Sequence, residues 1–138
     1  MATEFLNEKT YVDQAESVIE KLTTKFEKNG KWIQPQIVTT SKIRNILSMS
    51  ADIYDKVLQN NEELLGDERI SRIEYLRVRI IYECGREPKV KDFVDAAGLL
   101  DYVKMIGGEK KRYILFYHYL EALVAFHKYK IRRYARLE

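Results

Sequence analysis

Helix-breaking residues and reactive side chains are both scarce in this sequence. Its 138 residues include two prolines, six glycines, two histidines and one cysteine. A single cysteine excludes an internal disulfide, and we expect a reducing, cytoplasmic location. No apolar run approaches the roughly 18 residues that cross a bilayer, so we expect no membrane partner. The first residues, "MATEFLNEK", have neither the basic start nor the apolar core of a signal peptide.

What is present predicts a folded, basic protein. Hydrophobic residues make up 46% and charged residues 33% of the chain, and the length suits one domain spanning residues 1–138. Residues 1–68 hold 8 Lys/Arg and 12 Asp/Glu, a net charge of −4. Residues 69–138 hold 16 Lys/Arg and 9 Asp/Glu, a net charge of +7. A basic half favours a polyanionic partner such as nucleic acid; a solvated basic face is the alternative, and composition leaves both open.

Hydrophobic spacing predicts an all-α, single-domain bundle of about five or six helices. No segment shows sustained strand alternation, and "KWIQPQIV" and the polar residues 59–68 are predicted connections. The first predicted helix runs from Tyr11 to a stop near Gly30, and the second follows the N-cap residues 39–41. The third covers residues 69–84, with Gly85 as its C-terminal glycine. Two short helices in "PKVKDFVDAA" and "LLDYVKMI" precede a long one that runs from Glu109 almost to the end.

The third predicted helix carries arginines beside two apolar arcs. At 100° per residue the first arc holds Ile70, Ile73, Leu76, Ile80, Ile81 and Cys84, and the second holds Tyr75, Val78 and Tyr82. Arg72, Arg79 and Arg86 share a narrow strip between them. This strip is either a solvated edge or a ladder of guanidinium groups for phosphates, with tyrosines against sugars or bases. Arg77 falls inside the first arc and predicts a buried ion pair, with Glu74 or with a carboxylate of another helix.

Further cations lie near predicted helix ends. Lysine and arginine in the first turn of a helix oppose its macrodipole by about 0.3–1 kcal/mol each, and a bound phosphate would reverse that penalty. Cations at the end of the last helix complement the dipole, which alone could explain them, although their i, i+4, i+8 spacing also exposes them to RNA. The candidate RNA-binding residues are Lys42 and Arg44 after "TTS", Arg72, Arg79 and Arg86, Lys110 and Lys111 after "GG", and Lys128, Arg132 and Arg136.

Residues for catalysis are few. His118 and His127 lie nine residues apart on one helix and point about 180° away from each other, so they cannot bind one metal together. His127 lies near the apolar arc and is predicted to pack at the edge of the core. Cys84 has no CxxC companion and lies among isoleucines, which indicates a structural thiol. No catalytic triad, HEXXH motif or nucleotide fingerprint is visible, so we expect no enzyme, cofactor, metal or small-molecule substrate.

Four segments, taken in order, resemble a known family. They are "TTSKIRNIL", "RIEYLRVRIIYECGR", "VKDFVDAAGL" and "YLEALVAFHKY". Their order and spacing resemble the small α-helical subunit of type III-A CRISPR–Cas interference complexes, the Csm complex. The closest motif matches are Tyr82–Arg86, "YECGR", and Glu121–Lys128, "EALVAFHK". The resemblance covers residues 39–130, and residues 1–38 carry no recognised motif.

The resemblance implies a non-catalytic structural subunit. Its partners would be other Csm-complex subunits, further copies of itself, CRISPR RNA and target RNA, with several copies lining the channel for target RNA. Because base pairing with the guide reads the sequence, such a subunit needs to hold only phosphate and sugar. Two alternatives stay open. One is a DNA-binding protein of helix-turn-helix type, although the helices in residues 88–106 are not basic enough for a recognition helix. The other is a protein–protein adaptor without RNA contact.

Overall fold

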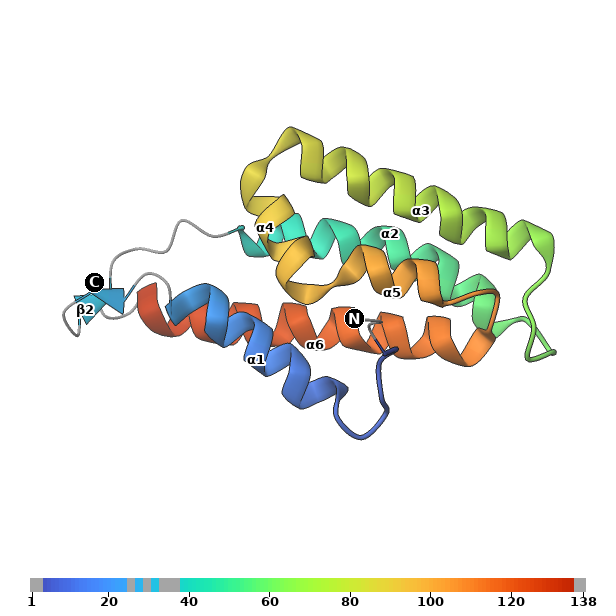
Figure 1. Ribbon diagram of the computed structural model, residues 1–138, viewed down its shortest axis with the longest axis horizontal. Helices are drawn as coiled ribbons and strands as arrows, with labels where there is room; N and C mark the ends of the chain where they lie inside the picture. Colours follow the sequence, from blue (N-terminus) through green and yellow to red (C-terminus); the bar gives the residue numbers. More distant parts are fainter. Residues whose placement is uncertain (1–3, 25–26, 29–30, 33–37, 136–138) are drawn as a thin grey trace.

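The computed structural model describes residues 4–24, 27–28, 31–32 and 38–135, and this part of the chain is almost entirely helical (Figure 1). The predicted all-α bundle is confirmed. In order, the elements are α1 (Tyr11–Thr24), β1 (Glu27–Lys28), β2 (Lys31–Trp32), α2 (Thr40–Leu58), α3 (Asp67–Arg86), α4 (Pro88–Ala97), α5 (Leu99–Met105) and α6 (Lys110–Ala135).

The helices are arranged in layers around α6. The long helix α6 packs mainly against α1 and α2, and α3 packs in turn against α2, α4 and α5. Helix α3 therefore lies at the outer edge of the molecule, on the far side of α2 from α6 (Figure 1). Its position leaves four large apolar or aromatic side chains exposed, at Tyr75, Val78, Ile81 and Tyr82.

Side chains from all six helices form one core. Two tyrosines that are fully buried satisfy their hydroxyl groups on backbone carbonyls: Tyr113 donates to Ser50 at 2.7 Å, and Tyr119 donates to Ala97 at 2.8 Å. These bonds join α6 to α2 and to the end of α4, so hydrogen bonds as well as apolar packing fix how these helices are placed relative to one another. The largest buried apolar side chains with them are Ile19, Ile43, Ile46, Ile80, Phe93, Leu99, Ile106, Phe116, Leu120 and Leu123.

Local chemistry explains most helix boundaries. Thr39 caps α2, because its hydroxyl oxygen accepts a hydrogen bond from the Lys42 backbone N–H at 3.3 Å. Pro88 begins α4, as predicted, and Glu87 before it is extended, with φ −142° and ψ 115°. Gly98 separates α4 from α5 with φ +70°, a left-handed conformation that only glycine adopts without strain.

Two predicted helix ends are wrong. The first helix ends at Thr24 rather than near Gly30, and the two-residue strands β1 and β2 follow, paired antiparallel with Lys28 opposite Lys31. The Thr23 hydroxyl donates to the carbonyl of Ile19 at 3.0 Å, a local bond that competes with helix propagation. Gly85, predicted to end the third helix, lies inside α3, because the stop comes from Pro88 instead.

Candidate nucleic-acid interface

The arginine strip on α3 lies on the surface, as its spacing predicts. Seven residues correspond to about 700°, within about 20° of two full turns, so Arg72, Arg79 and Arg86 follow one line along the helix. All three are exposed. Arg72 contacts Glu68 at 3.2 Å and Arg86 contacts Glu83 at 3.4 Å. The Arg72–Glu68 pair is exposed and therefore weak, so Arg72 can exchange its carboxylate for a phosphate at small cost. The Glu83 side chain is only 12% exposed, so releasing Arg86 would leave a largely buried carboxylate without its partner.

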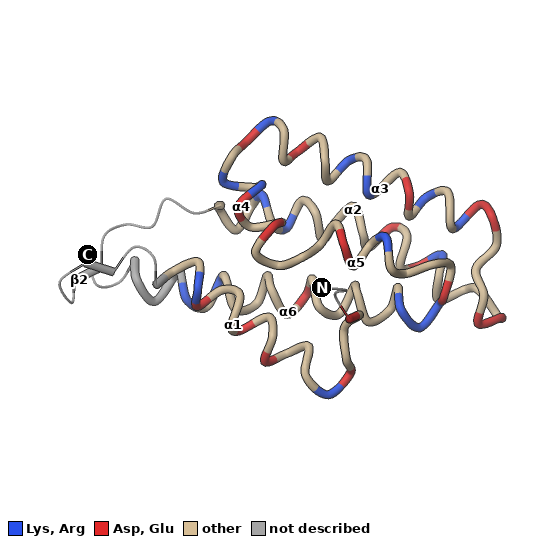
Figure 2. Tube along the Cα trace, in the orientation of Figure 1, with Lys and Arg blue, Asp and Glu red and all other residues tan. Residues whose placement is uncertain are grey.

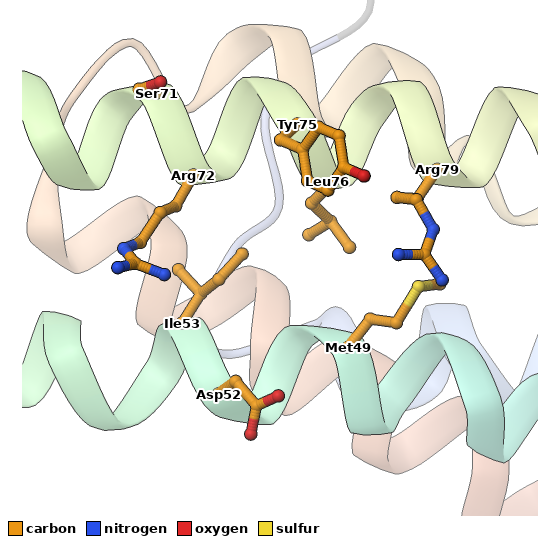
Figure 3. Close-up of a pocket in the computed structure, with 8 residues that line it drawn as sticks. All are labelled: Met49, Asp52, Ile53, Ser71, Arg72, Tyr75, Leu76 and Arg79. Carbon is orange, nitrogen blue, oxygen red and sulfur yellow. The ribbon is translucent and has the colours of Figure 1, made fainter.

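Arg72 and Arg79 stand over a groove between α2 and α3. The groove has a volume of about 410 Å³ and is lined by Met49, Asp52, Ile53, Ser71, Arg72, Tyr75, Leu76 and Arg79. Figure 3 shows both guanidinium groups reaching from α3 toward α2, on either side of Tyr75 and Leu76. Arg79 has no carboxylate partner among the described residues, and Asp52 stands on the opposite wall. The groove thus has an apolar floor, two arginines on its α3 side and one carboxylate, Asp52, on its α2 side.

Two tyrosines extend the rim outward. Tyr75 and Tyr82 are 61% and 60% exposed, which is high for aromatic rings. The guanidinium carbon of Arg79 lies 6.0 Å from the centre of the Tyr75 ring, and that of Arg86 lies 5.6 Å from the Tyr82 ring. The second apolar arc predicted for this helix, which also contains Val78, is therefore a solvent-facing surface. Ile81, predicted in the first arc, is also exposed.

Arg77 does not lie inside the bundle. Its guanidinium group contacts Glu74 at 3.1 Å, so the predicted partner is confirmed, but the side chain keeps 34% of its area exposed and Glu74 keeps 55%. The prediction of a buried ion pair is wrong. Arg77 lies at the margin of the arc, where its long side chain can reach water while its methylenes cover apolar neighbours.

The start of α2 lies beside the end of α3. Lys42 contacts Glu87 at 3.3 Å across the two elements, and Arg44 is exposed with no carboxylate partner in the described part of the chain. Lys42 is therefore close to the Arg86 end of the strip, since Glu87 directly follows Arg86. The structure brings this part of the predicted set together.

The cations that begin α6 form a separate group. The Lys110 ammonium donates to the carbonyl of Asn60, Lys111 lies 3.9 Å from Glu63, and the Arg112 guanidinium lies 2.9 Å from Glu109. Their partners belong largely to the acidic connection between α2 and α3, whose Leu65 N–H donates to the Gly108 carbonyl at 2.8 Å. The connection thus balances part of their charge, and the start of α6 lies at the opposite end of the molecule from the end of α3 (Figure 2).

The third predicted group lies toward the end of α6. Lys128 is exposed there. The side chain of Arg132 and the whole of Arg136 lie outside the described residues. The nearby Lys130 contacts Glu20 of α1 at 3.2 Å and helps to join the two helices. Arg132 and Arg136 stay predictions, and Lys128 lies on α6, apart from the strip on α3.

Comparison with known proteins decides the family. A model of the family described as "Csm2 Type III-A" matches residues 16–133. The chain belongs to this family. Proteins named "CRISPR system Cms protein Csm2" are similar over most of their length. The Streptococcus thermophilus protein is 38% identical over 124 residues, which are 90% of this chain and 93% of the relative. The Mycobacterium tuberculosis H37Rv protein is 40% identical over 119 residues, 86% of this chain and 90% of the relative.

The Csm2 family match extends the resemblance found in the sequence. It begins at residue 16, inside α1, whereas the recognised motifs begin at residue 39. Helix α1 packs against α6 and α4 and is part of the same core. Among the described residues, no helix is long and apolar enough to cross a membrane.

The histidine of the "EALVAFHK" motif has a structural role in this Csm2-family chain. His127 is fully buried, with Nε2 2.7 Å from the Val38 carbonyl oxygen and Nδ1 3.0 Å from the Thr40 hydroxyl. Because a carbonyl can only accept, Nε2 carries the proton and Nδ1 accepts from Thr40. Burial lowers the pKa of His127. The predicted packed histidine is confirmed, and its contacts tie α6 to the start of α2.

His118 and Cys84 lie in surroundings different from those of His127. His118 lies among aromatic rings, 6.5 Å from the centre of Tyr11 and 6.1 Å from that of Tyr54. Cys84 is partly buried, and burial together with the nearby Asp95 raises its pKa. A raised pKa keeps the thiol protonated and weakly nucleophilic, which fits the predicted structural role.

Proposed function

We propose that this Csm2-family chain is a non-catalytic, RNA-binding structural subunit of a cytoplasmic type III-A CRISPR effector complex. Its arginine strip and the α2–α3 groove hold the phosphate–sugar backbone of RNA beside other subunits and further copies of the chain. One observation carries the proposal: Arg72 and Arg79 stand on the rim of one groove, and Arg79 has no carboxylate partner among the described residues.

The charge distribution supports backbone binding over sequence reading. An arginine strip on the outer side of a packed helix presents guanidinium groups without inserting the helix into a groove of a duplex. The family's relation to CRISPR systems fits this, because guide pairing supplies the sequence information there. Cleavage chemistry, in this proposal, belongs to other subunits.

Helices α4 and α5 do not favour the helix-turn-helix alternative. A recognition helix needs an exposed face with side chains that reach base edges. Helix α5 has only seven residues, and Leu99, Tyr102 and Val103 of these are buried in the core. A protein–protein adaptor stays the competing function, and the experiment below separates it from RNA binding.

Target-RNA capture by a reconstituted complex tests the proposal. Complexes are assembled with the unmodified chain, with an Arg72→Ala/Arg79→Ala variant, and with a Lys91→Ala/Lys104→Ala variant. The last removes the same charge from α4 and α5, which do not line the groove. We expect normal assembly in all three and weaker capture only for the arginine variant, with cleavage of bound RNA unchanged. Failed assembly of the arginine variant, with capture unaffected per assembled complex, would establish the adaptor function instead.

A further inference from the structure

Helix α3 carries a repeat of arginine and tyrosine with a period of seven residues. The pattern is Arg72-x2-Tyr75-x3-Arg79-x2-Tyr82-x3-Arg86. A seven-residue period places equivalent side chains on nearly the same line along a helix, about 10.5 Å apart. The two tyrosines therefore form an exposed row beside the arginine row, and Tyr75 also lines the outer edge of the α2–α3 groove.

Each tyrosine is paired with the arginine four residues later. The guanidinium carbons lie 6.0 Å and 5.6 Å from the centres of the Tyr75 and Tyr82 rings. This contact orients the ring and leaves much of it free, since both side chains are about 60% exposed. Each unit thus offers an aromatic surface and a cation one helical turn apart.

We propose that Tyr75 and Tyr82 are stacking platforms for unpaired nucleobases of the RNA that the arginine strip holds. The proposal rests on the proposed function and specifies which kind of RNA binds. Single-stranded nucleic acid is held by aromatic rings that stack on bases next to cations that hold the backbone, and stacking tolerates any base sequence. Tyr75 with Arg79, and Tyr82 with Arg86, each supply both parts.

The spacing selects against regularly stacked bases. Bases of one strand in a regular duplex follow each other at about 3.4 Å, roughly a third of the distance between the two rings. A tyrosine ring also cannot reach the face of a base that is stacked inside a duplex. The two platforms therefore fit bases that are turned out of the stack, as in single-stranded segments recognised by proteins.

A protein helix is the competing occupant of this face. Val78 and Ile81 are also exposed beside the tyrosines, and exposed apolar surface often marks a protein interface. The arginine row favours a polyanion, because Arg79 has no carboxylate partner in the described part of the chain and Arg72 has only an exposed, local one. The experiment treats protein docking as an outcome that overturns the proposal.

The test measures binding of the full chain to a labelled oligouridine of about 12 nucleotides at about 50 mM salt. An abasic ribose-phosphate chain of equal length and a duplex of equal length are the competing probes. Tyr75→Ala/Tyr82→Ala removes both rings, Tyr75→Phe/Tyr82→Phe keeps them, and Tyr75→Leu/Tyr82→Leu keeps apolar bulk alone. Val12→Ala/Leu64→Ala removes two exposed apolar side chains from elsewhere, 45% and 68% exposed, and is the control.

We expect the unmodified chain and the phenylalanine variant to prefer oligouridine over both other probes. The alanine and leucine variants should lose about fivefold or more in affinity for oligouridine, fall to the affinity of the abasic chain, and keep the same salt slope. The control variant should bind normally.

The outcomes separate this proposal from the one on which it rests. Tyrosine variants that bind oligouridine normally overturn the stacking proposal, while a shallower salt slope in Arg72→Ala/Arg79→Ala would still support backbone binding. If the unmodified chain binds none of the probes measurably, both the stacking proposal and the backbone-binding proposal are overturned for the isolated chain. Normal RNA binding by the alanine variant with loss of complex assembly would assign the tyrosine face to a protein partner.

Discussion

The imidazole Nε2 of His127 lies 2.7 Å from the carbonyl oxygen of Val38, 89 residues earlier in the chain. Together with the contact between Nδ1 and the Thr40 hydroxyl, this bond fixes the entry to α2 against α6. The first turn of α2 carries Lys42, whose contact with Glu87 joins α2 to the end of α3. The buried histidine therefore supports the geometry of the candidate RNA interface without touching it.

Replacing His127 with alanine should destabilise the chain. The change leaves a cavity, an unpaired carbonyl on Val38 and an unpaired hydroxyl on Thr40, a cost of about 2–3 kcal/mol. Urea unfolding followed by circular dichroism measures the free energy. A His127→Ala variant with the stability of the unmodified chain would mean that the contacts of His127 contribute nothing.

The contribution of His127 should also depend on pH, with a definite sign. Burial lowers its pKa below the 6.5 of a free histidine, so the unfolded chain binds the proton first as the pH falls. The stability that neutral His127 provides is present above pH 6.5 and is lost as the pH falls through the lower folded pKa. Comparing the unmodified chain with His127→Gln, which does not titrate, at several pH values isolates this effect. A stability difference that stays constant across pH 5–7 would contradict it.

Lys110 and Lys111 should behave differently although they are neighbours. The Lys110 ammonium donates to the Asn60 carbonyl and holds the connection between α2 and α3, whereas Lys111 is 80% exposed and 3.9 Å from Glu63. We expect Lys110→Met to cost about 1–2 kcal/mol and Lys111→Met less than about 0.5 kcal/mol. Thermal or urea unfolding of both variants checks this, and equal losses would show that the Asn60 contact is unimportant.

Gly98 and Gly85, which lie near the two ends of α4, allow a paired test of the backbone conformation at these helix boundaries. Gly98 has φ +70°, and a Cβ there would meet the Tyr102 ring at 3.3 Å, so Gly98→Ala should cost about 1–2 kcal/mol. Gly85 lies inside α3 with nothing within 4 Å of an added Cβ, so Gly85→Ala should stabilise by about 0.5–1 kcal/mol. Unfolding free energies of opposite sign are the expected result; a stabilised Gly98→Ala variant would contradict the assigned backbone conformation.

The sequence predicts features that depend on one helix better than those that depend on two. The alignment of Arg72, Arg79 and Arg86 follows from residues per turn alone, and Thr39 and Pro88 mark helix starts through local chemistry. The groove could not be predicted, because Asp52 and Met49 face the strip only once α2 packs on α3. Arg77 shows the limit within one helix: the helical angle predicts it inside the apolar arc, but the buried arc is narrower, since Ile81 is also exposed, and the long side chain reaches water.

Arg77 therefore yields a prediction opposite to that of the sequence. Its surface pair with Glu74 should contribute less than about 1 kcal/mol, so Arg77→Ala and Arg79→Ala should unfold at nearly the same urea concentration. A markedly less stable Arg77→Ala variant would restore the buried ion pair.

The salt dependence of target-RNA affinity tests the backbone-binding account most directly. Each phosphate contact to a single strand contributes about −0.7 to the slope of log affinity against log salt concentration. Complexes assembled with Arg72→Ala/Arg79→Ala should bind target RNA more weakly, with a slope shallower by about 1.4 for each copy in contact with RNA. Complexes with Lys91→Ala/Lys104→Ala should keep the slope of the unmodified complex. An arginine variant with unchanged affinity and unchanged slope would contradict the account and assign the strip to packing or protein contacts.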